Sequence, residues 1–139
     1  MEIKEYLKLM LEKDASDMFY RAGANVRIRT DGKIVAVDER IVSLDEVNEA
    51  VKQLTSQELR DFFQRNLDVD FGVYVPELKH RFRISIFMQR NWPALVIRNI
   101  RSDPQAFEEL NLPTEALKRL SLETRGLVLL TGSAGSGKS

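Results

Sequence analysis

The chain has 139 residues, and its 21 Lys plus Arg balance its 21 Asp plus Glu, so the formal net charge is zero. This balance gives no support for nucleic-acid binding, and the absence of cysteine excludes disulfides and thiolate metal sites. The single histidine, His80, cannot build a histidine metal site alone, and no apolar stretch approaches the ~20 residues needed to cross a bilayer. Because the charged N-terminus is also unlike a signal peptide, we expect a soluble cytoplasmic protein.

The first third of the chain predicts one helix and three strands. Apolar side chains recur at helical spacing over about residues 2–13, and packing against a core is favoured over binding of a partner. Short strands are predicted at Met18–Tyr20, Val26–Arg29 and Ile34–Val37, the last two joined by an Asp31-Gly32 hairpin turn. The basic side of Val26–Arg29 is interpreted as a solvated sheet face, with contact to a ligand phosphate as the alternative.

Two short helices are predicted next, each beginning at a capping box. Ser43-Leu44-Asp45-Glu46 begins a helix that runs to about Leu54, and Thr55-Ser56-Gln57-Glu58 begins a second that ends near Asn66. Two successive amphipathic helices are typical of a cover over one face of a sheet. The side of the second helix expected to be buried consists of Leu59, Phe62 and Phe63.

Three further strands are predicted, over about residues 68–75, 81–88 and 94–97, and their short connections favour antiparallel pairing. Asp68 and Asp70 share one face of the first strand, and Arg81 and Arg83 share one face of the next. The simpler interpretation is cross-strand ion pairing, which stabilises little when exposed. The functional interpretation is that one or both arginines reach a phosphate across a cleft.

The only tryptophan and the only histidine of the chain are both predicted to have structural roles. Trp92 is the only tryptophan, and it is predicted to be a packing residue rather than a platform for a ligand. His80 is predicted to be an exposed residue at a strand end. Neither residue is expected to carry chemistry, and no base beside the Asp68 and Asp70 pair supports catalysis there.

From residue 101 the pattern changes to a proline-bounded linker over residues 101–113 that contains a short helical stretch. A helix follows over about residues 114–120, with Leu117 and Leu120 facing inward. The apolar run Gly126–Thr131 is then predicted to be a buried parallel strand.

The last eight residues match the phosphate-binding loop G-x-x-x-x-G-K-[ST]. Glycines let successive backbone N–H groups turn toward one point and bind phosphate oxygens. Lys138 is expected to contact the terminal phosphates of a nucleotide and the Ser139 hydroxyl to bind Mg²⁺. A flexible Gly/Ser tail is the alternative, and the apolar run before the loop counts against it. The expected nucleotide-binding residues are Gly132, Ser133, Ala134, Gly135, Ser136, Gly137, Lys138 and Ser139.

Shorter motifs precede this loop in a fixed order. They are Ala15-Ser16-Asp17-Met18 with Gly23, Arg29-Thr30-Asp31-Gly32, Asp68-Val69-Asp70-Phe71, Arg81-Phe82-Arg83-Ile84, Arg98-Asn99-Ile100, Leu110-Asn111-Leu112-Pro113 and Arg125-Gly126-Leu127-Val128. Together they cover nearly the whole chain, and they resemble the type IV pilus retraction ATPases of the PilT/PilU kind, within the secretion ATPases. The loop alone occurs in many NTPases, so the ordered series of motifs carries the resemblance.

The resemblance implies an α+β chain in three parts. Residues 1–100 are expected to form a PAS-like domain, in which helices cover an antiparallel sheet. Residues 101–113 are expected to be an interdomain linker, and residues 114–139 the first helix and strand of a RecA-like ATPase domain that ends in the phosphate-binding loop. In the family the nucleotide lies between the two domains. The arginines expected to approach its phosphates are Arg81, Arg83 and Arg98.

The resemblance also implies a function. It indicates a hexameric ring that uses ATP and Mg²⁺ to power pilus retraction and twitching motility. The implied partners are further copies of the chain, a pilus assembly platform protein of the inner membrane and a paralogous retraction ATPase, with no nucleic acid. The implied location is the cytoplasmic face of the inner membrane, held there through these partners.

The sequence departs from the family pattern at several points. Ala24-Asn25 stands where a Pro-Pro pair is usual, and Met18-Phe19-Tyr20 replaces a Leu-His-Leu pattern, which favours the PilU-like accessory branch or a divergent paralogue. The family's acidic and histidine boxes do not occur within the 139 residues, so we expect no catalytic residue and no ATP hydrolysis from this stretch alone. A non-catalytic PAS-like interaction or ligand-sensing domain is the alternative. A different enzyme with a phosphate-binding loop, such as a kinase, is a weaker alternative, because the N-terminal motifs count against it.

Overall fold

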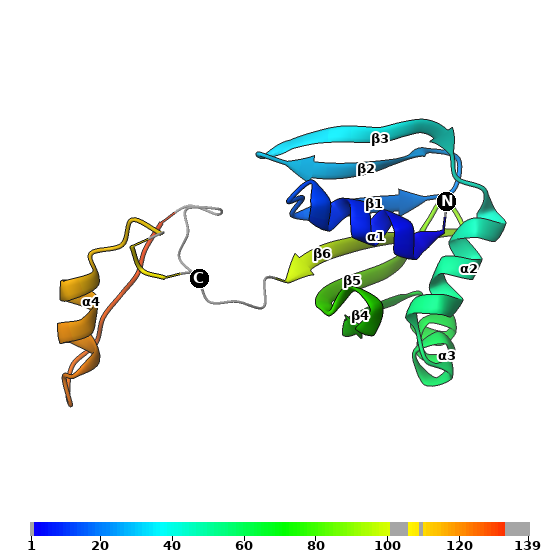
Figure 1. The fold of residues 1–139 in the computed structure, drawn as a ribbon. Helices are drawn as coiled ribbons and strands as arrows, with labels where there is room; N and C mark the ends of the chain where they lie inside the picture. Colours follow the sequence, from blue (N-terminus) through cyan, green and yellow to red (C-terminus); the bar gives the residue numbers. More distant parts are fainter. Residues whose placement is uncertain (1, 101–105, 109, 133–139) are drawn as a thin grey trace. The chain divides into compact units, whose positions relative to one another are not determined.

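In a computed structural model, the chain forms two compact units, Met1–Ser102 and Asp103–Ser139. The structure describes residues 2–100, 106–108 and 110–132, and Figure 1 shows how the elements follow one another. The first unit has the expected mixed α+β composition. Its elements are α1 (Ile3–Glu12), β1 (Asp17–Arg21), β2 (Asn25–Thr30), β3 (Lys33–Ile41), α2 (Leu44–Leu54), α3 (Gln57–Asn66), β4 (Asp68–Val75), the short 3₁₀ helix Pro76–Leu78, β5 (His80–Gln89) and β6 (Trp92–Ile100).

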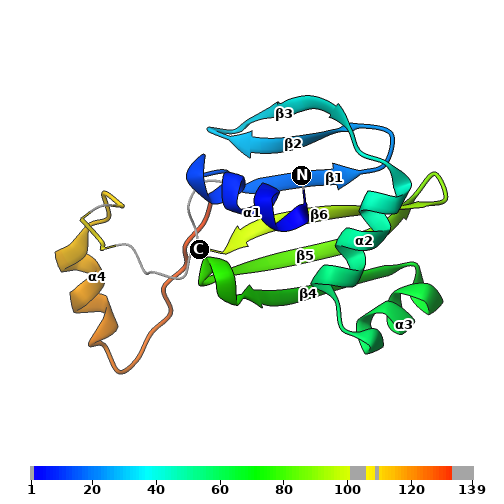
Figure 2. The ribbon, with the colours of Figure 1, turned by 45° about the vertical axis from the view of Figure 1, so that its right-hand side comes forward.

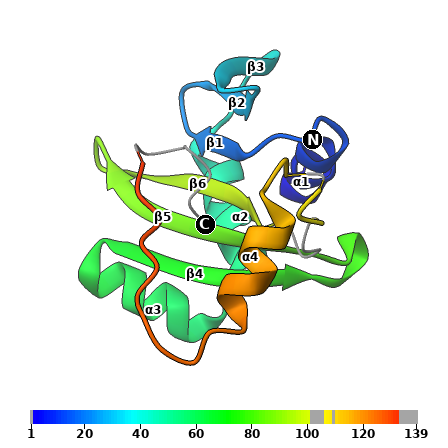
Figure 3. The ribbon, with the colours of Figure 1, turned by 90° about the vertical axis from the view of Figure 1, so that its left-hand side faces the viewer.

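The six strands form one fully antiparallel sheet in the order β3-β2-β1-β6-β5-β4. Figure 3 shows this order from β3 at the top to β4 at the bottom. The predicted strands are all present, and β3 and β6 show the largest difference, because each is five residues longer than the sequence pattern indicated. The first and last strands of the unit, β1 and β6, are neighbours at the centre of the sheet.

The core lies between one face of the sheet and the helices α1 and α2, which lie across that face in Figure 2. Alternate residues of the central strands supply the sheet side, and the helices supply apolar side chains with no exposed surface. The principal core residues are Tyr6, Leu7, Met10, Met18, Val26, Ile28, Val47, Phe82, Ile84, Ile86, Leu95 and Ile97. Because side chains alternate along a strand, the intervening residues lie on the opposite face, here named the open face.

The predicted capping box is present at the start of α2, but the predicted N-cap of α3 is wrong by one residue. In α2 the Ser43 side chain accepts a hydrogen bond from the Glu46 N–H, and Glu46 bonds back to the Ser43 N–H. In α3 the N-cap is Ser56 rather than Thr55, because its hydroxyl accepts from the Leu59 N–H. The Thr55 hydroxyl instead donates to a carbonyl at the end of α2, so it is not available to cap α3.

The apolar side of α3 is less buried than its spacing predicted. Leu59 and Phe63 are half-buried against the core, while the Phe62 side chain is exposed. Figure 3 shows α3 beside the edge strand β4 rather than over the centre of the sheet, and this leaves one flank of the helix in solvent.

The second unit contains α4 (Thr114–Ser121), as predicted, but two other predictions for it are wrong. Residues 107, 108, 110 and 111 form turns in place of a helical stretch, and the Leu112 N–H donates to the Phe107 carbonyl at 2.9 Å. Leu120 is exposed rather than inward-facing. The predicted strand Gly126–Thr131 is extended but unpaired, because no described residue offers it a neighbouring strand, and its leucines are exposed.

No helix in the described ranges has the length and apolar character required to cross a membrane. The domain limits expected from the sequence, at residues 1–100, 101–113 and 114–139, remain predictions.

Candidate phosphate-binding site

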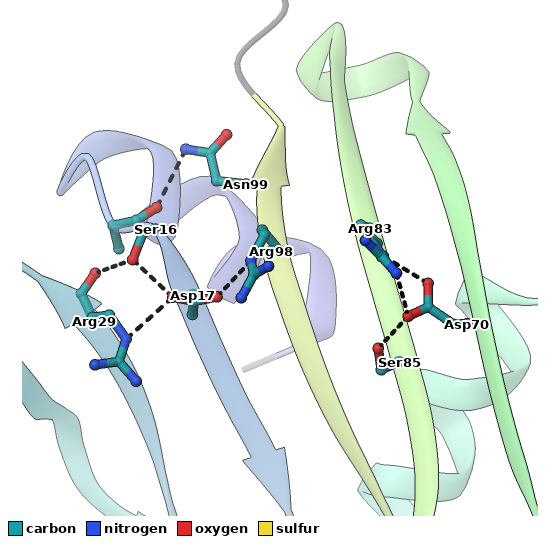
Figure 4. Close-up of polar contacts among 9 residues, drawn as sticks. Ser16, Asp17, Arg29, Asp70, Arg83, Ser85, Arg98 and Asn99 are labelled. Atoms are coloured by element: carbon teal, nitrogen blue, oxygen red, sulfur yellow. Dashed lines mark hydrogen bonds and ion pairs between the residues drawn. The ribbon is translucent and has the colours of Figure 1, made fainter. Parts of the chain in front are cut away.

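The open face of the sheet carries a row of arginines and carboxylates across five neighbouring strands, β2, β1, β6, β5 and β4. In the strand register Asp17 of β1 lies opposite Arg29 of β2 on one side and Arg98 of β6 on the other. Arg98 lies in turn opposite Arg83 of β5. Figure 4 shows these side chains on one side of the ribbon, with Asp17 between two arginines and Asp70 beside Arg83.

Asp17 is the buried centre of this row, with 6% of its surface exposed. Its Oδ2 accepts from Arg29 Nε at 3.2 Å and from the Ser16 hydroxyl at 2.9 Å, and its Oδ1 accepts from Arg98 Nε at 3.0 Å. Burial opposes ionisation of this carboxyl, but the Ser16 hydroxyl and the charges of Arg98 and Arg29 outweigh it, so the pKa of Asp17 lies below its usual value. Asp17 is therefore a carboxylate that holds two guanidinium groups in place.

Arg83 forms a second, separate ion pair. Its Nε and Nη2 donate to the two carboxylate oxygens of Asp70 at 2.8 and 3.0 Å, and the Ser85 hydroxyl adds a third bond to Asp70 at 2.9 Å. The Arg83 hydrogen bond lowers the pKa of Asp70. Both side chains remain about half exposed, so this bidentate pair is accessible from solvent. The cross-strand pairing predicted from the sequence is confirmed for Asp70 with Arg83.

Arg81 occupies the same face, two residues before Arg83. It lies opposite Tyr74 of β4 and Ile100 of β6, and it is exposed. Within the described ranges it forms no ion pair or side-chain hydrogen bond. The fold thus brings the three predicted arginines, Arg81, Arg83 and Arg98, onto one surface, where they differ in their anionic partners.

A chain of hydrogen bonds fixes the end of β6 beside this row. Asn99 donates from its amide nitrogen to the Ala15 carbonyl at 3.2 Å, and its Oδ1 lies 2.6 Å from His80 Nε2. His80 is half-buried and packs against Phe82, so the prediction of an exposed strand-end residue is wrong. Its role is to bind Asn99, which the local sequence pattern could not indicate.

Two residues of this site were missed by sequence reasoning. Arg29 was interpreted as part of a solvated basic face, with phosphate contact as the alternative, and Asp17 was named only as part of a motif. The signal available for Asp17 was its place in the Ala15-Ser16-Asp17-Met18 motif. Its two arginine partners could not be inferred, because Arg98 is 81 positions away in the sequence.

Chemically, the open face presents guanidinium groups suited to phosphate oxygens. Arginine binds phosphate and carboxylate with the same fork of N–H donors, so an arginine held by an exposed carboxylate is able to exchange it for a phosphate. Of the expected loop residues only Gly132 is described, and it is exposed, while Ser133–Ser139 lie outside the described residues. The described residues contain no cluster of three acidic or histidine side chains able to hold a metal ion.

The sequence matches the family described as Type II/IV secretion system protein over residues 1–139. It is 37% identical to the type IV pilus ATPase PilU and 35% identical to the type IV pilus retraction ATPase PilT, both of Pseudomonas aeruginosa. Both matches cover the whole chain, which spans 36% and 40% of the length of these relatives. The resemblance to the pilus retraction ATPases is thereby confirmed.

Solved structures agree with the fold. The crystal structure of the pilus retraction motor PilT with bound ADP has a TM-score of 0.82 and 33% identity, and the match covers 99% of this chain and 40% of that one. The ATPase DotB of Legionella pneumophila has a TM-score of 0.63 at 19% identity over 98% of this chain and 38% of its own, and it supports the fold alone.

Proposed function

Because the chain belongs to the type II/IV secretion system protein family, we propose that it is part of an ATP-hydrolysing motor that drives type IV pilus retraction. The observation that carries this proposal is the family match over all 139 residues together with the G-x-x-x-x-G-K-S loop at positions 132–139. Two relatives are pilus ATPases, and the similar PilT crystal structure contains bound ADP. The first unit then supplies arginines to a nucleotide, and the loop supplies the phosphate cradle.

ATP with Mg²⁺ is the proposed cofactor pair. Loop residues Gly132–Ser139 bind the phosphates, Lys138 contacts the terminal phosphates and the Ser139 hydroxyl contacts the metal. When bound, Mg²⁺ would neutralise part of the negative charge on the phosphates. These roles fit the donor types present, because the loop is rich in backbone N–H groups and the open face is rich in guanidinium groups.

Among the arginines, Arg83 is the best placed to change partner. Its Asp70 partner is about half exposed, so water replaces the lost hydrogen bonds when the pair opens. Arg98 differs, because its partner Asp17 is buried and also holds Arg29. We therefore assign Arg83 to phosphate contact, together with Arg81, which has no ion-pair partner among the described residues, and we assign Arg98 to holding Asp17.

The proposal extends to assembly and location. The motor is a hexameric ring at the cytoplasmic face of the inner membrane, and it acts with a pilus assembly platform protein and a paralogous ATPase. The motor domain is RecA-like, and the first unit is a PAS-like domain. The 139 residues alone are proposed to be inactive, because the family's acidic and histidine boxes do not occur in their sequence.

The test is ATP hydrolysis by a protein that contains this chain followed by the remainder of a family motor domain. Lys138→Ala should abolish hydrolysis, and Arg83→Gln should reduce kcat by about a hundredfold or more, as expected for loss of a charged transition-state contact. Arg65→Gln on α3 is the matched control, and its activity should equal that of the wild type. Full hydrolysis by the Lys138 variant would contradict the proposed function.

A second candidate is a non-catalytic PAS-like interaction or ligand-sensing domain. It is favoured by the completeness of the first unit, which has its own sheet, helices and core. The same protein separates the two candidates. Wild-type protein that binds a partner or small ligand but has no measurable ATPase activity would favour the interaction domain.

A further inference from the structure

A pocket of about 250 Å³ lies at the end of the sheet where the β1–β2 and β5–β6 connections meet. Figure 2 shows these connections at the right of the sheet, at the far end from the C-terminal end of β6. The pocket is therefore separate from the row that contains Asp17 and Arg98. Its lining includes Arg21, Gly23, Gln89, Arg90 and Trp92.

The indole of Trp92 forms an exposed apolar wall of this pocket. Its side chain is 47% exposed, so the prediction that Trp92 is a packing residue holds for only part of the ring. The covered part lies against Gly23, where a Cβ would be 3.8 Å from Trp92 Cζ3. Half-exposed tryptophans of this kind are enriched at sites where one protein binds another.

The shape of the pocket is fixed by tight backbone turns. Gln89 and Trp92 are paired, and the two residues between them, Arg90 and Asn91, both have positive φ, 53° and 64°. Two central residues with positive φ are the signature of a type I′ hairpin turn, whose twist matches that of the strands. A pre-formed pocket binds with less loss of conformational entropy than a mobile loop.

Two guanidinium groups give the pocket its charge. Arg21 and Arg90 are exposed, and within the described ranges neither forms an ion pair or a side-chain hydrogen bond. Among the described residues, no acidic side chain lines the pocket. In contrast to Arg83 and Arg98, these arginines have no carboxylate partner in the described chain, so the pocket is complementary to an anion.

We infer that this pocket binds an acidic peptide segment of a partner protein, with one aromatic side chain against Trp92 and flanking carboxylates on Arg21 and Arg90. The volume supports a side chain as the occupant, because pockets for whole small molecules usually measure ~300–1,000 Å³. Arginine and tryptophan are also the residues most enriched at binding hot spots. This inference does not depend on the proposed motor function.

The test uses the fluorescence of Trp92, which reports on the pocket directly because the chain has no other tryptophan. The probes are three blocked hexapeptides: one phenylalanine flanked by glutamates, the same peptide with lysines in place of the glutamates, and the glutamate peptide with glycine in place of phenylalanine. The first should produce a saturable change in emission. The other two should bind at least tenfold more weakly.

Variants locate the contact. Arg90→Asn removes the charge while asparagine tolerates the positive φ, and it should weaken binding of the first peptide about three- to fivefold, as should Arg21→Gln. The matched control is Lys8→Gln on α1, which removes one exposed positive charge elsewhere and should leave the affinity unchanged. Urea unfolding of each variant, with a midpoint equal to that of the wild type, confirms that the fold is intact.

Three outcomes would overturn the inference. The first is no change in Trp92 emission with any peptide. The second is equal affinity for the lysine peptide, which would remove the argument from charge. The third is an equal emission change with benzoate at the same concentration, because the pocket would then bind a small aromatic acid and not a peptide segment.

Discussion

Arg83 and Arg98 lie directly opposite one another in the ladder between β5 and β6, with both side chains on the open face. Like charges in this position repel one another, and the structure relieves the repulsion by pairing each arginine with a different carboxylate. Arg83 binds exposed Asp70, and Arg98 binds buried Asp17. The two carboxylates therefore have different importance for the fold, and the first two predictions follow from this difference.

Asp17→Asn should destabilise the first unit by about 1–3 kcal/mol, because it removes the buried charge that holds Arg29 and Arg98 and leaves their charges uncompensated. The measurement is the free energy of unfolding in urea, followed by circular dichroism. The matched control is Asp68→Asn on β4, an exposed carboxylate on the same face. Equal unfolding free energies for the two variants would refute the structural role of Asp17.

Arg83→Gln should change the free energy of unfolding by less than ~1 kcal/mol, because its pair with Asp70 is exposed. The same urea titration measures this quantity. A small effect on stability means that any loss of ATPase activity in this variant reports on phosphate contact. A loss of several kcal/mol would instead make Arg83 a structural residue and remove that interpretation.

The folded chain should lose stability in acid as the Glu46 carboxylate becomes protonated. The Ser43 backbone N–H and the Arg40 guanidinium lower the pKa of Glu46 from its usual 4.5 to about 2 in the folded chain. A lowered folded pKa means that the carboxylate stabilises the fold above pH 4.5, and that this contribution disappears as the pH falls from 4.5 toward 2.

Glu46→Gln isolates this contribution, because glutamine keeps the capping geometry but does not titrate. The variant should be less stable than the wild type at pH 6, and the difference in unfolding free energy should shrink steadily between pH 4.5 and 2. Urea titrations at four pH values measure it. A difference that stays constant over this range would show that the carboxylate charge of Glu46 has no role.

Gly23→Ala should cost about 1 kcal/mol, because Gly23 has a φ of +72° that favours glycine. The added methyl group would contact Trp92 at an ordinary distance, so the cost comes from the backbone and not from a clash. Gly72→Ala is the matched control, since it lies in β4 with open space around it and no positive φ. It should be neutral or slightly stabilising, and equal losses in both variants would refute the backbone explanation.

The elements that the sequence predicted well are those with a local signal. The alternation of Phe82 and Ile84 with Arg81 and Arg83 was sufficient to assign the faces of β5, and Ser43 with Glu46 marked the start of α2. The face of a strand on which a side chain lies, and the capping of a helix, depend on residues only two to four positions apart. For the same reason Arg81 and Arg83 were correctly placed on one face of their strand.

The features that escaped prediction depend on distant partners. The contacts of Asp17 with Arg98 and of His80 with Asn99 arise from strand register, which joins segments far apart in the sequence. The apolar run Gly126–Thr131 has the composition of a buried strand, but composition does not supply a neighbouring strand. Ser56 in place of Thr55 at the start of α3 is a shift of one residue, within the ordinary uncertainty of helix ends.

The central position of β6 has a mechanical consequence. β6 pairs with β5 over all nine of its residues and with β1 over Ala94–Arg98. Antiparallel hydrogen bonds run perpendicular to the strands, so β6 is held from both sides at the centre of the sheet. An edge strand such as β3 is held from one side only, and the last strand of the first unit is therefore harder to detach from the sheet than an edge strand is.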